Sequence, residues 1–424
     1  MYFLCVCPSL AQRRRFSPAV RHTVLATLLV PLGCGSGDAP RTTFATRDSA
    51  GIRIVVSLAP AWTEGDAWSV DSIPNLDLSG GDDEELFRIG SGRLLEDGRL
   101  VFFNGGACEV RSYSSSGALL ARVGRCGEGP GEFEDFATLW VWHDSIVVID
   151  QLTRVTVLGT DGTLRRTARL PASRDLPVPF VRGVLDDGTF VVAGLRDPVG
   201  RTSPGVEPGQ STLGLLRSLD DTTRIVGTYP GPTFEYTEFG GRLGRGPLAF
   251  SSSTQFAAGG NHVFVGFPDR YEIRIHGADG SLQGIIRRAF TPVRVDQHDL
   301  DWLMERRLAE VDGEENQRAV RQAFRNLRHA ELMPAFGPPV WPGGAEGGPA
   351  MLVDAEGNLW VFVHYRPGEY RNDWSVFSAD GVWLGTVALP EHLAPSQMGA
   401  DHIIGSWTDE TGFVHIRRHR LIKR

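Results

Sequence analysis

A near-absence of lysine is the most unusual feature of this 424-residue sequence, because Lys423 is the single lysine among its 43 basic residues. Schiff-base catalysis on a lysine and a lysine-bearing phosphate loop are therefore excluded. No apolar run is as long as the roughly 18 residues of a spanning helix, which excludes a multi-pass membrane protein. The Gly-x-Ser-x-Gly pattern is also missing, so no nucleophile elbow is indicated.

Glycine and proline are abundant instead, with 51 and 26 residues, and 41% of the residues are hydrophobic. This composition excludes wholesale disorder and indicates a folded chain rich in turns. The formal net charge is −8. A chain with an excess of acid has no global positive field, so we expect no nucleic-acid partner.

The first 34 residues have the features of an export signal. A basic stretch with Arg13, Arg14 and Arg15 precedes a short apolar segment, Val24–Leu32. An apolar segment of this length is typical of a signal peptide rather than of an anchor helix. We therefore predict a signal peptide over residues 1–34.

Gly33-Cys34 ends this segment and resembles the lipobox of bacterial lipoproteins. The resemblance implies that Cys34 carries lipid and becomes the new amino terminus. The protein would then be a periplasmic or outer-membrane lipoprotein that touches the membrane only through this anchor, with residues 35–47 as a flexible linker. Ordinary secretion, or an anchor with an unmodified cysteine, is the alternative.

Cys108 and Cys126 are the cysteines that remain if Cys34 is lipidated and the two earlier ones are lost. They flank a predicted hairpin whose turn glycine, Gly117, lies midway between them. Because an exported compartment permits disulfides, we predict a bridge between Cys108 and Cys126. A metal-binding pair is the alternative, but no neighbouring His or Cys completes a four-ligand set.

A recurring unit organises the rest of the sequence. It consists of an apolar strand, an acidic-Gly turn, a second apolar strand and a second hairpin. The first three units turn at Gly98, Asp144 and Gly188, about 45 residues apart, which is the length of a four-stranded propeller blade. Three further units turn at Gly260, Gly357 and Gly412. The intervals between these turns are longer, which predicts insertions.

The sixth unit contains only two predicted strands instead of four. We predict that Gly51–Val56 and Trp68–Asp71 complete its sheet, which would close the ring and remove exposed edges. The predicted fold is therefore all-β, a six-bladed β-propeller over residues 48–424 that is closed by its N- and C-terminal strands. A pair of β-sandwiches is the alternative, which the even period disfavours.

The run Gly124-Arg-Cys-Gly-Glu-Gly-Pro-Gly-Glu-Phe133, together with Val353-Asp-Ala-Glu-Gly-Asn-Leu-Trp-Val361, resembles the six-bladed β-propeller family of exported bacterial proteins related to NHL repeats. The resemblance implies a fold and no common activity. Within the first run the glycines permit positive φ, Pro130 stiffens the turn, and Phe133 is predicted to lie between adjacent blades. A phosphate cradle is the alternative, but no Gly-Lys-Ser/Thr and no following helix support it.

The long insertions all fall in connections that leave one face of the predicted propeller. Elaborated loops on one face of a rigid scaffold commonly form a binding site. Clustered Arg and Tyr side chains on this face suit a small ligand, a peptide or an envelope protein, while solvated loop charge is the alternative. The insertions are Asp197–Gln210, Tyr229–Leu248, Ala289–Gly348 and Arg366–Asp373. The candidate recognition residues are Arg196, Arg201, Tyr236, Arg242, Arg245, Arg366, Tyr370 and Arg371.

The longest insertion is predicted to hold a helical hairpin at about 296–332. Apolar residues such as Leu300, Leu303 and Met304 recur there at helical spacing, and Asp312-Gly313 separates the two helices. A structural cap over the channel mouth and a lid or partner-docking hairpin are both compatible with this pattern.

Catalytic patterns are poor. His143, His262 and His364 come from different blades and could approach the central axis, where they would bind a divalent metal in a lactonase-like hydrolase or lyase. No local metal-ligand spacing supports this alternative, and solvated loop histidines account for the same residues. We therefore predict no cofactor, and a monomeric exported scaffold that binds a ligand or protein rather than an enzyme.

Overall fold

The computed structural model describes residues 42–79, 86–196, 203–239, 242–325, 327–338, 348–369 and 371–424, apart from the side chains of Phe239 and Arg242. The predicted signal peptide with Cys34 lies outside these ranges, as do Arg201 and Tyr370. Residues 42–424 form one structural unit.

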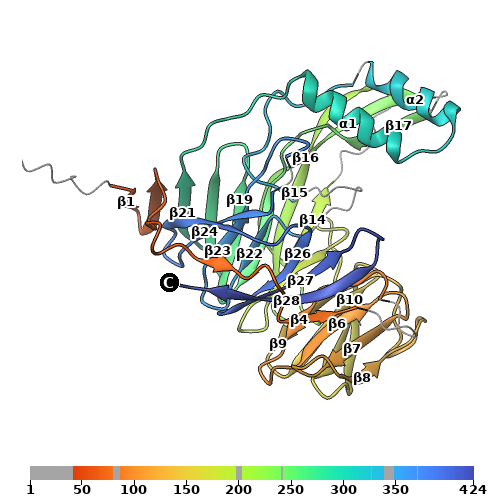
Figure 1. Cartoon of the computed structure of the whole chain (residues 1–424), viewed down its shortest axis with the longest axis vertical. Coiled ribbons are helices and arrows are strands. Elements are labelled where there is room, and N and C mark those ends of the chain that lie inside the picture. Colours follow the sequence, from red (N-terminus) through yellow and green to blue (C-terminus); the bar gives the residue numbers. More distant parts are fainter. Residues whose placement is uncertain are drawn as a thin grey trace, which may run out of the picture. The chain divides into compact units, whose positions relative to one another are not determined.

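The strands of this unit form six sheets, which we call blades one to six in chain order (Figure 1). The strands of blades one to three are β5 (Arg93–Leu94), β6 (Leu100–Asn104), β7 (Glu109–Tyr113), β8 (Leu119–Val123), β9 (Ala137–Trp142), β10 (Ser145–Asp150), β11 (Arg154–Gly159), β12 (Leu164–Arg169), β13 (Phe180–Val184), β14 (Phe190–Arg196), β15 (Gly205–Leu216), β16 (Arg224–Phe239) and β17 (Arg242–Pro247). Blades four to six contain the later strands β18 (Gln255–Gly259), β19 (His262–Phe267), β20 (Glu272–Gly277), β21 (Leu282–Arg288), β22 (Met351–Val353), β23 (Leu359–Phe362), β24 (Asp373–Phe377), β25 (Trp383–Ala388), β26 (Leu393–Met398), β27 (His402–Thr408) and β28 (Val414–Ile422).

The first strands of the six blades follow one another in a cycle. β5 lies against β9, β9 against β13, β13 against β18, β18 against β22, β22 against β26, and β26 against β5. Sheets arranged around their first strands define a β-propeller. The fold is therefore an all-β propeller with one helical insertion, as the repeat pattern predicts.

Turn chemistry explains why the blades form where the acidic-Gly pairs lie. In the turn after β5, the Asp97 carboxylate accepts a hydrogen bond of 3.0 Å from the backbone N–H of Arg99, and Gly98 takes a φ of 83°. The turn after β11 repeats this pattern, with Asp161 accepting from Thr163 and Gly162 at a φ of 85°. An Asp that caps its own turn, followed by a glycine in the left-handed region, favours tight reversal of the chain.

The connections define two faces of the propeller. We call the end with the turns between first and second strands the turn face, and the opposite end the loop face. The long insertions lie on the loop face, where Ala249 pairs with His329 and the Arg366 side chain reaches Asp296. The prediction that the insertions share one face agrees with these contacts.

Blade six differs from the prediction in how its strands are divided. Three late strands, β26 to β28, form it, and the turn near Gly412 joins its second and third strands rather than its first and second. The early strands β3 (Ser69–Val70) and β4 (Leu76–Leu78) both pair antiparallel with β28 and supply the outer edge. Leu393–Met398 does not read as a strand in the sequence because Pro395 interrupts it, and in the structure a bulge there accommodates the proline.

The strand predicted at Gly51–Val56 is present but joins another blade. β2 (Ile52–Ser57) pairs in parallel with β21 at the outer edge of blade four, and β1 (Phe44–Ser49) pairs with β2 (Figure 1). The prediction that this strand completes blade six is therefore wrong, and so is a flexible linker that extends to residue 47. A hairpin with Ala50 and Gly51 at positive φ joins β1 and β2, which is the turn geometry that antiparallel pairs favour.

The third blade is longer than predicted. The sequence suggests a loop over Tyr229–Leu248, but β16 continues to Phe239 and β17 returns along it. The extension of β15 to Gly205 pairs with Tyr236 of β16. Glycines and prolines within these strands masked their alternation.

The predicted helical hairpin is confirmed as α1 (Gln297–Ala309) and α2 (Glu314–Phe324). Asp296 and Asp299 form a capping box at the start of α1, and Gly313 precedes α2 with a φ of 85°. The hairpin is held at its base, where Val295 N–H donates to the Glu331 carbonyl at 3.0 Å. No helix of the described chain is long and apolar enough to span a bilayer.

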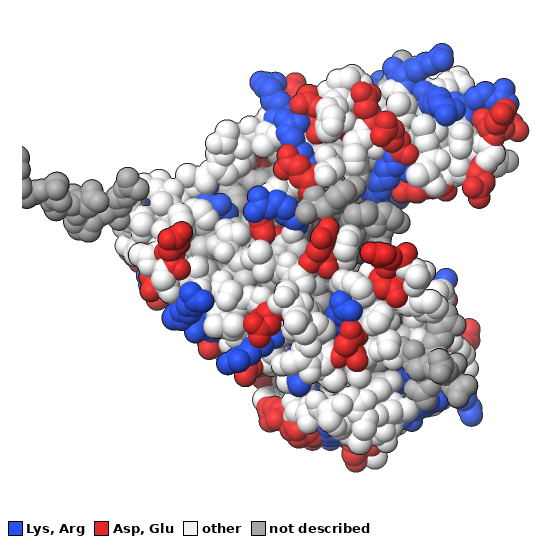
Figure 2. Space-filling model, in the orientation of Figure 1, with Lys and Arg blue, Asp and Glu red and all other residues white. Residues whose placement is uncertain are grey.

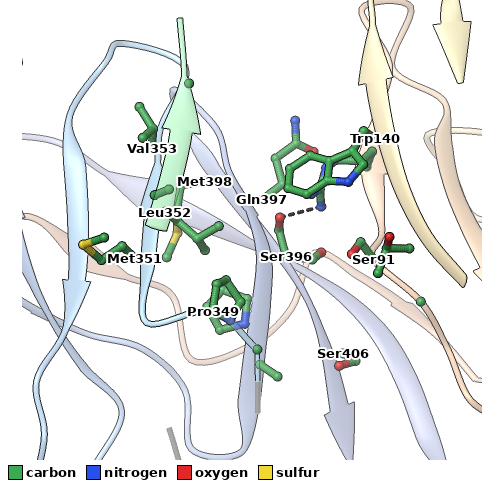
Figure 3. Close-up of a pocket in the computed structure, with 18 of the residues that line it drawn as sticks. Ser91, Trp140, Pro349, Met351, Leu352, Val353, Ser396, Gln397, Met398 and Ser406 are labelled. Carbon is green, nitrogen blue, oxygen red and sulfur yellow. Dashed lines mark hydrogen bonds between the residues drawn. The ribbon is translucent and has the colours of Figure 1, made fainter. Parts of the chain in front are cut away.

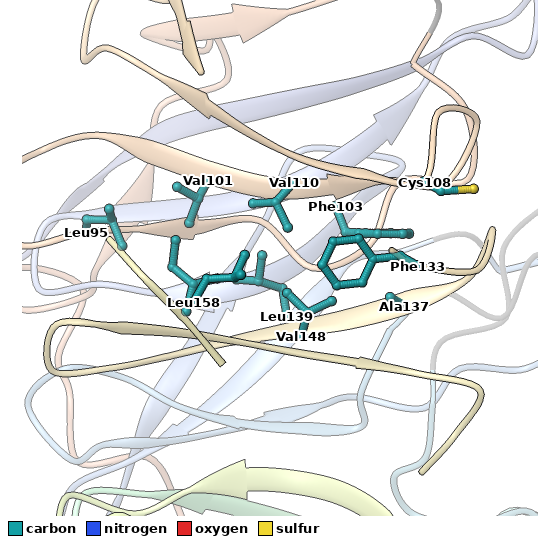
Figure 4. Close-up of a cluster of buried hydrophobic side chains, with 11 residues drawn as sticks. Leu95, Val101, Phe103, Cys108, Val110, Phe133, Ala137, Leu139, Val148 and Leu158 are labelled. Carbon is teal, nitrogen blue, oxygen red and sulfur yellow. The ribbon is translucent and has the colours of Figure 1, made fainter. Parts of the chain in front are cut away.

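Hydrophobic clusters fill the spaces between neighbouring blades. One cluster joins blades one and two, where Phe133 is fully buried against the ring of Phe103 (Figure 4). This confirms the predicted place of Phe133. The predicted disulfide is also present, because Cys108 and Cys126 are bonded with an S–S distance of 2.05 Å.

Candidate functional site

The arginines of the loop face were the first candidates for recognition, and several are already paired. Arg366 donates to Asp296 at 2.8 Å and to Asp299 at 2.9 Å, which fixes the start of α1 to blade five. Arg371 contacts Asp373 at 2.7 Å, and Arg196 lies 3.8 Å from the Asp175 carboxylate. On the face that Figure 2 presents, acidic and basic side chains are interspersed.

The remaining described candidates are held within the third blade. Tyr236 is buried with 7% exposure, and the Arg245 guanidinium lies 4.7 Å from the ring centre of Phe234. Arg242 pairs through its backbone with Phe239. The structure therefore distributes the predicted recognition residues over separate local contacts and does not gather those it describes into one site.

The three histidines of the metal alternative lie at two ends of the propeller. His143 is in a turn-face connection, where its Nε2 is 3.2 Å from the Asp186 carbonyl, and His262 begins β19 at the same face. His364 follows β23 at the loop face, beside Gly337. Within the described ranges they do not form a group with metal-ligating distances.

A different group, Asp296, His298 and Asp299, does have ligand atoms within 4.8 Å of one another. Asp296 accepts a hydrogen bond from the His298 N–H, Asp299 accepts one from the Asp296 N–H, and both carboxylates accept from Arg366. The positive end of the α1 dipole and a guanidinium both oppose a further cation there. We therefore interpret this group as a helix cap joined to blade five.

His364 gives a testable pH dependence. Burial lowers the pKa of His364 to about 4, so the folded protein holds this ring neutral. The ordinary histidine pKa is about 6.5, so the unfolded chain takes up a proton at His364 before the folded protein does as the pH falls. The free energy of unfolding is therefore unaffected by this group above pH 6.5 and decreases as the pH falls from about 6.5 towards 4. Between pH 7 and pH 5, we expect the wild-type protein to lose about 2 kcal/mol more unfolding free energy than His364→Gln.

Urea unfolding at the two pH values measures this difference. His329→Gln is the control, because His329 is exposed and its replacement should leave the pH dependence of stability as in the wild type. Equal pH dependence in the wild type and His364→Gln would contradict the assignment.

A large cavity lies between the first strands of all six blades. Its volume is about 1430 Å³, and its walls include Leu94 of β5, Trp140 of β9, Phe256 of β18, Leu352 of β22 and Met398 of β26. Because successive side chains of a strand point to opposite faces of its sheet, not every residue of a first strand lines the cavity. Thr138 and Trp140 line the cavity, for example, while Leu139 between them is buried in the core.

Two arginines provide the charge within the strand-lined part of this cavity. Arg93 belongs to β5 and Arg182 to β13, and both line the cavity. The acidic lining residues lie in the connections beyond the strand ends: Asp186, Asp354, Glu391, Asp409 and Glu410. The middle of the channel is therefore cationic although the chain as a whole is acidic.

A β-bulge directs Arg182 into the cavity. Val181 pairs with Val192 and Gly183 with Val191, so Arg182 has no partner in the ladder. Bulges are frequent beside functional sites because they redirect one side chain. Gly183 is required next to it, since a Cβ there would lie 2.7 Å from the Cβ of Ala258 in the neighbouring blade.

Arg93 is fixed two blades away from Arg182, on β5 of blade one. Its guanidinium donates to the carbonyls of Gly92 and Ser396 and lies 4.9 Å from the ring centre of Trp140. Burial lowers the pKa of Arg93 to about 10, which still leaves it charged at neutral pH. The residue is 8% exposed, and no carboxylate of the described chain pairs with it.

The walls of the cavity differ in polarity. Figure 3 shows Trp140 and Ser91 on one side, Met351, Leu352 and Val353 on the other, and Ser396 and Gln397 between them. One wall thus offers hydrogen-bond donors and positive charge, and the other offers an apolar surface. A cavity of this kind suits a ligand that has both characters.

The sequence analysis did not identify Arg93, Trp140 or Arg182. A signal for Arg182 was available, because a glycine inside a strand pattern indicates a bulge or a close approach of two backbones, and Gly183 follows it directly. Arg93 had no comparable signal, since its contact with Ser396 joins residues that are 303 positions apart.

No family model matches this sequence, and no curated protein matches it significantly. Solved structures similar to it include a proposed exported protein from Bacteroides fragilis, with a TM-score of 0.47 and 14% identity over 88% of this chain and 99% of that one. A gluconolactonase from Xanthomonas campestris has a TM-score of 0.40 and 13% identity over 81% and 91% of the two chains. Virginiamycin B lyase from Staphylococcus aureus has a TM-score of 0.37 and 10% identity over 82% and 99%. Similarity at this level assigns no function, and the description of the fold rests on the strand pairing.

Proposed function

We propose that this protein is an exported ligand-binding β-propeller whose ligand occupies the cavity between the first strands of its six blades. In this proposal the blades close into a complete ring related to NHL-repeat propellers, and lipid on Cys34 attaches the protein to a membrane of the cell envelope. The observation that supports ligand binding most directly is the cavity of about 1430 Å³ with one polar and one apolar wall. Typical ligand pockets have volumes of about 300–1,000 Å³, so the cavity has room for a small organic molecule or a short peptide.

The contacts on the loop face favour the cavity, rather than the loop face itself, as the binding site. Arg366 and Arg371 bind carboxylates of their own chain, and a ligand would have to replace those ion pairs. Arg182 has no ion pair or hydrogen bond within the described part of the chain, so a ligand there displaces only water. The metal-dependent hydrolase or lyase has no corresponding observation in its favour.

A pair of Thr→Trp variants tests this location. Thr138 lies on β9 and lines the cavity, whereas Thr167 lies exposed on β12, the outer strand of the same blade. A ligand found by a thermal-shift screen of sugars, peptides and organic acids should raise the melting temperature of the wild type and of Thr167→Trp. It should lose its effect on Thr138→Trp, because the indole occupies the space that the ligand needs.

Circular dichroism of the unliganded variants verifies that both are folded. If the ligand stabilises Thr138→Trp as much as Thr167→Trp, the cavity is not its binding site. A surface site on the loop face would then be the better explanation.

A further inference from the structure

Arg182 is the side chain of the cavity whose position is hardest to explain by folding alone. It is exposed within the cavity, and it makes no hydrogen bond or ion pair with the described part of the chain. Its neighbours Val181 and Gly183 both have ladder partners, so the bulge places this one residue outside the sheet. Burial of the surrounding region lowers the pKa of Arg182, which means that the charged form is held at a cost.

Two further donors lie on the same side of the cavity. Trp140, on the neighbouring first strand, has a buried indole N–H that finds no hydrogen-bond partner among the described residues. Arg93 lies against its ring and adds a second positive charge. Three adjacent blades therefore place two guanidinium groups and the Trp140 ring at the cavity, and the acidic side chains among the described lining residues lie beyond the strand ends.

The opposite wall has the reverse character. Met351, Leu352 and Val353 of β22 and Met398 of β26 line it with apolar side chains (Figure 3). Leu352 and Val353 are partly exposed at the cavity, whereas Met351 and Met398 are each 2% exposed and pack mainly into the interblade cores. An organic molecule with a charged end and an apolar body would satisfy both walls together.

We propose that the ligand of this cavity is an amphipathic organic carboxylate, whose head accepts hydrogen bonds from Arg182 and whose apolar body lies against β22 and β26. This inference rests on the ligand-binding function proposed above. The guanidinium fork matches a carboxylate with two parallel hydrogen bonds, and such charge-assisted bonds are among the strongest in proteins. Arg93 acts through its positive potential, because it already donates to the Gly92 and Ser396 carbonyls.

Isothermal titration of the full-length protein with octanoate, 1-octanol and acetate tests the inference. Octanoate should bind at least about ten-fold more tightly than 1-octanol, and acetate should bind more weakly than octanoate because it lacks the apolar body. In Arg182→Met, which keeps an apolar stem, octanoate affinity should fall about ten- to hundred-fold while 1-octanol affinity stays the same. Arg182→Lys should give an intermediate affinity, since it keeps the charge and loses the fork.

Arg166→Met is the matched control, because Arg166 is an exposed arginine of β12 and should leave octanoate affinity unchanged. Equal affinity for octanoate and 1-octanol, unchanged octanoate affinity in Arg182→Met, or no octanoate binding at all would overturn the carboxylate inference. The ligand-binding function would fail separately, if binding of any ligand persisted undiminished in Thr138→Trp.

Discussion

Phe133→Ala is expected to lower the free energy of unfolding by about 3–5 kcal/mol, the range for removing a large buried aromatic side chain. The Phe133 side chain is fully buried, and its ring contacts the Phe103 ring edge-on at 5.7 Å between centres. Gly124 lies directly over it, since a Cβ at that glycine would approach the ring to 2.5 Å. The alanine variant leaves a cavity between blades one and two that this close packing prevents from collapsing.

Urea unfolding monitored by circular dichroism measures the loss. Phe136→Ala is the matched control, because Phe136 is three residues further along and 61% exposed, and exposed substitutions usually change stability by less than about 0.5 kcal/mol. If the two variants lost equal stability, Phe133 would not be the residue that joins the two blades.

The positions of the blades were predictable because short-range chemistry determines them. Asp97-Gly98 and Asp161-Gly162 close their own turns by hydrogen bonds that span two residues, so the sequence alone contains all the partners. The helical hairpin was predictable for the same reason, since the spacing of apolar residues and the break at Gly313 are local. Phe133 was placed correctly because a glycine-rich segment must run between sheets.

The assignment of edge strands was less predictable because strand pairing is a long-range choice. β2 is rich in β-branched residues, Ile-Arg-Ile-Val-Val-Ser, and this sequence does not specify whether β21 or β28 is its partner. In the folded protein β2 pairs with β21, whereas the shorter β3 and β4 pair with β28. The side chains of both strands determine which strands pair, so the apolar pattern of one strand does not predict its partner.

The candidate site was the least predictable part. Arg366 and Arg371 are charges on elaborated loops, but Arg366 binds the distant Asp299 and Arg371 binds Asp373, two residues further along the chain. Arg182 lies in an apolar strand and has no such partner in the described part of the chain, and only the register shift of β13 shows that it leaves the ladder. Sequence reasoning therefore identified charged residues correctly and could not determine which of them remain free for a ligand.

Arg154 connects the glycine-rich segment to blade two. It is 4% exposed, and its Nε lies 2.8 Å from the Asp150 carboxylate, which is itself 1% exposed. The same guanidinium donates to the carbonyls of Gly127 and Glu132, and the Glu134 N–H donates to Asp150. The buried Arg154–Asp150 pair thus provides hydrogen-bond partners for backbone groups of Gly127, Glu132 and Glu134 in the glycine-rich segment.

Arg154→Met should therefore destabilise the protein by about 3–5 kcal/mol, because it leaves the Asp150 carboxylate buried without a counter-charge. Arg165→Met is the matched control: Arg165 lies on the adjacent strand and binds Asp144, but that pair is exposed and its loss should have little effect on urea unfolding. Adding Asp150→Asn to Arg154→Met should restore part of the lost stability, since the uncompensated charge is then removed. If Arg154→Met unfolds at the same urea concentration as Arg165→Met, or if the second substitution destabilises the protein further, the buried pair does not hold the segment in place.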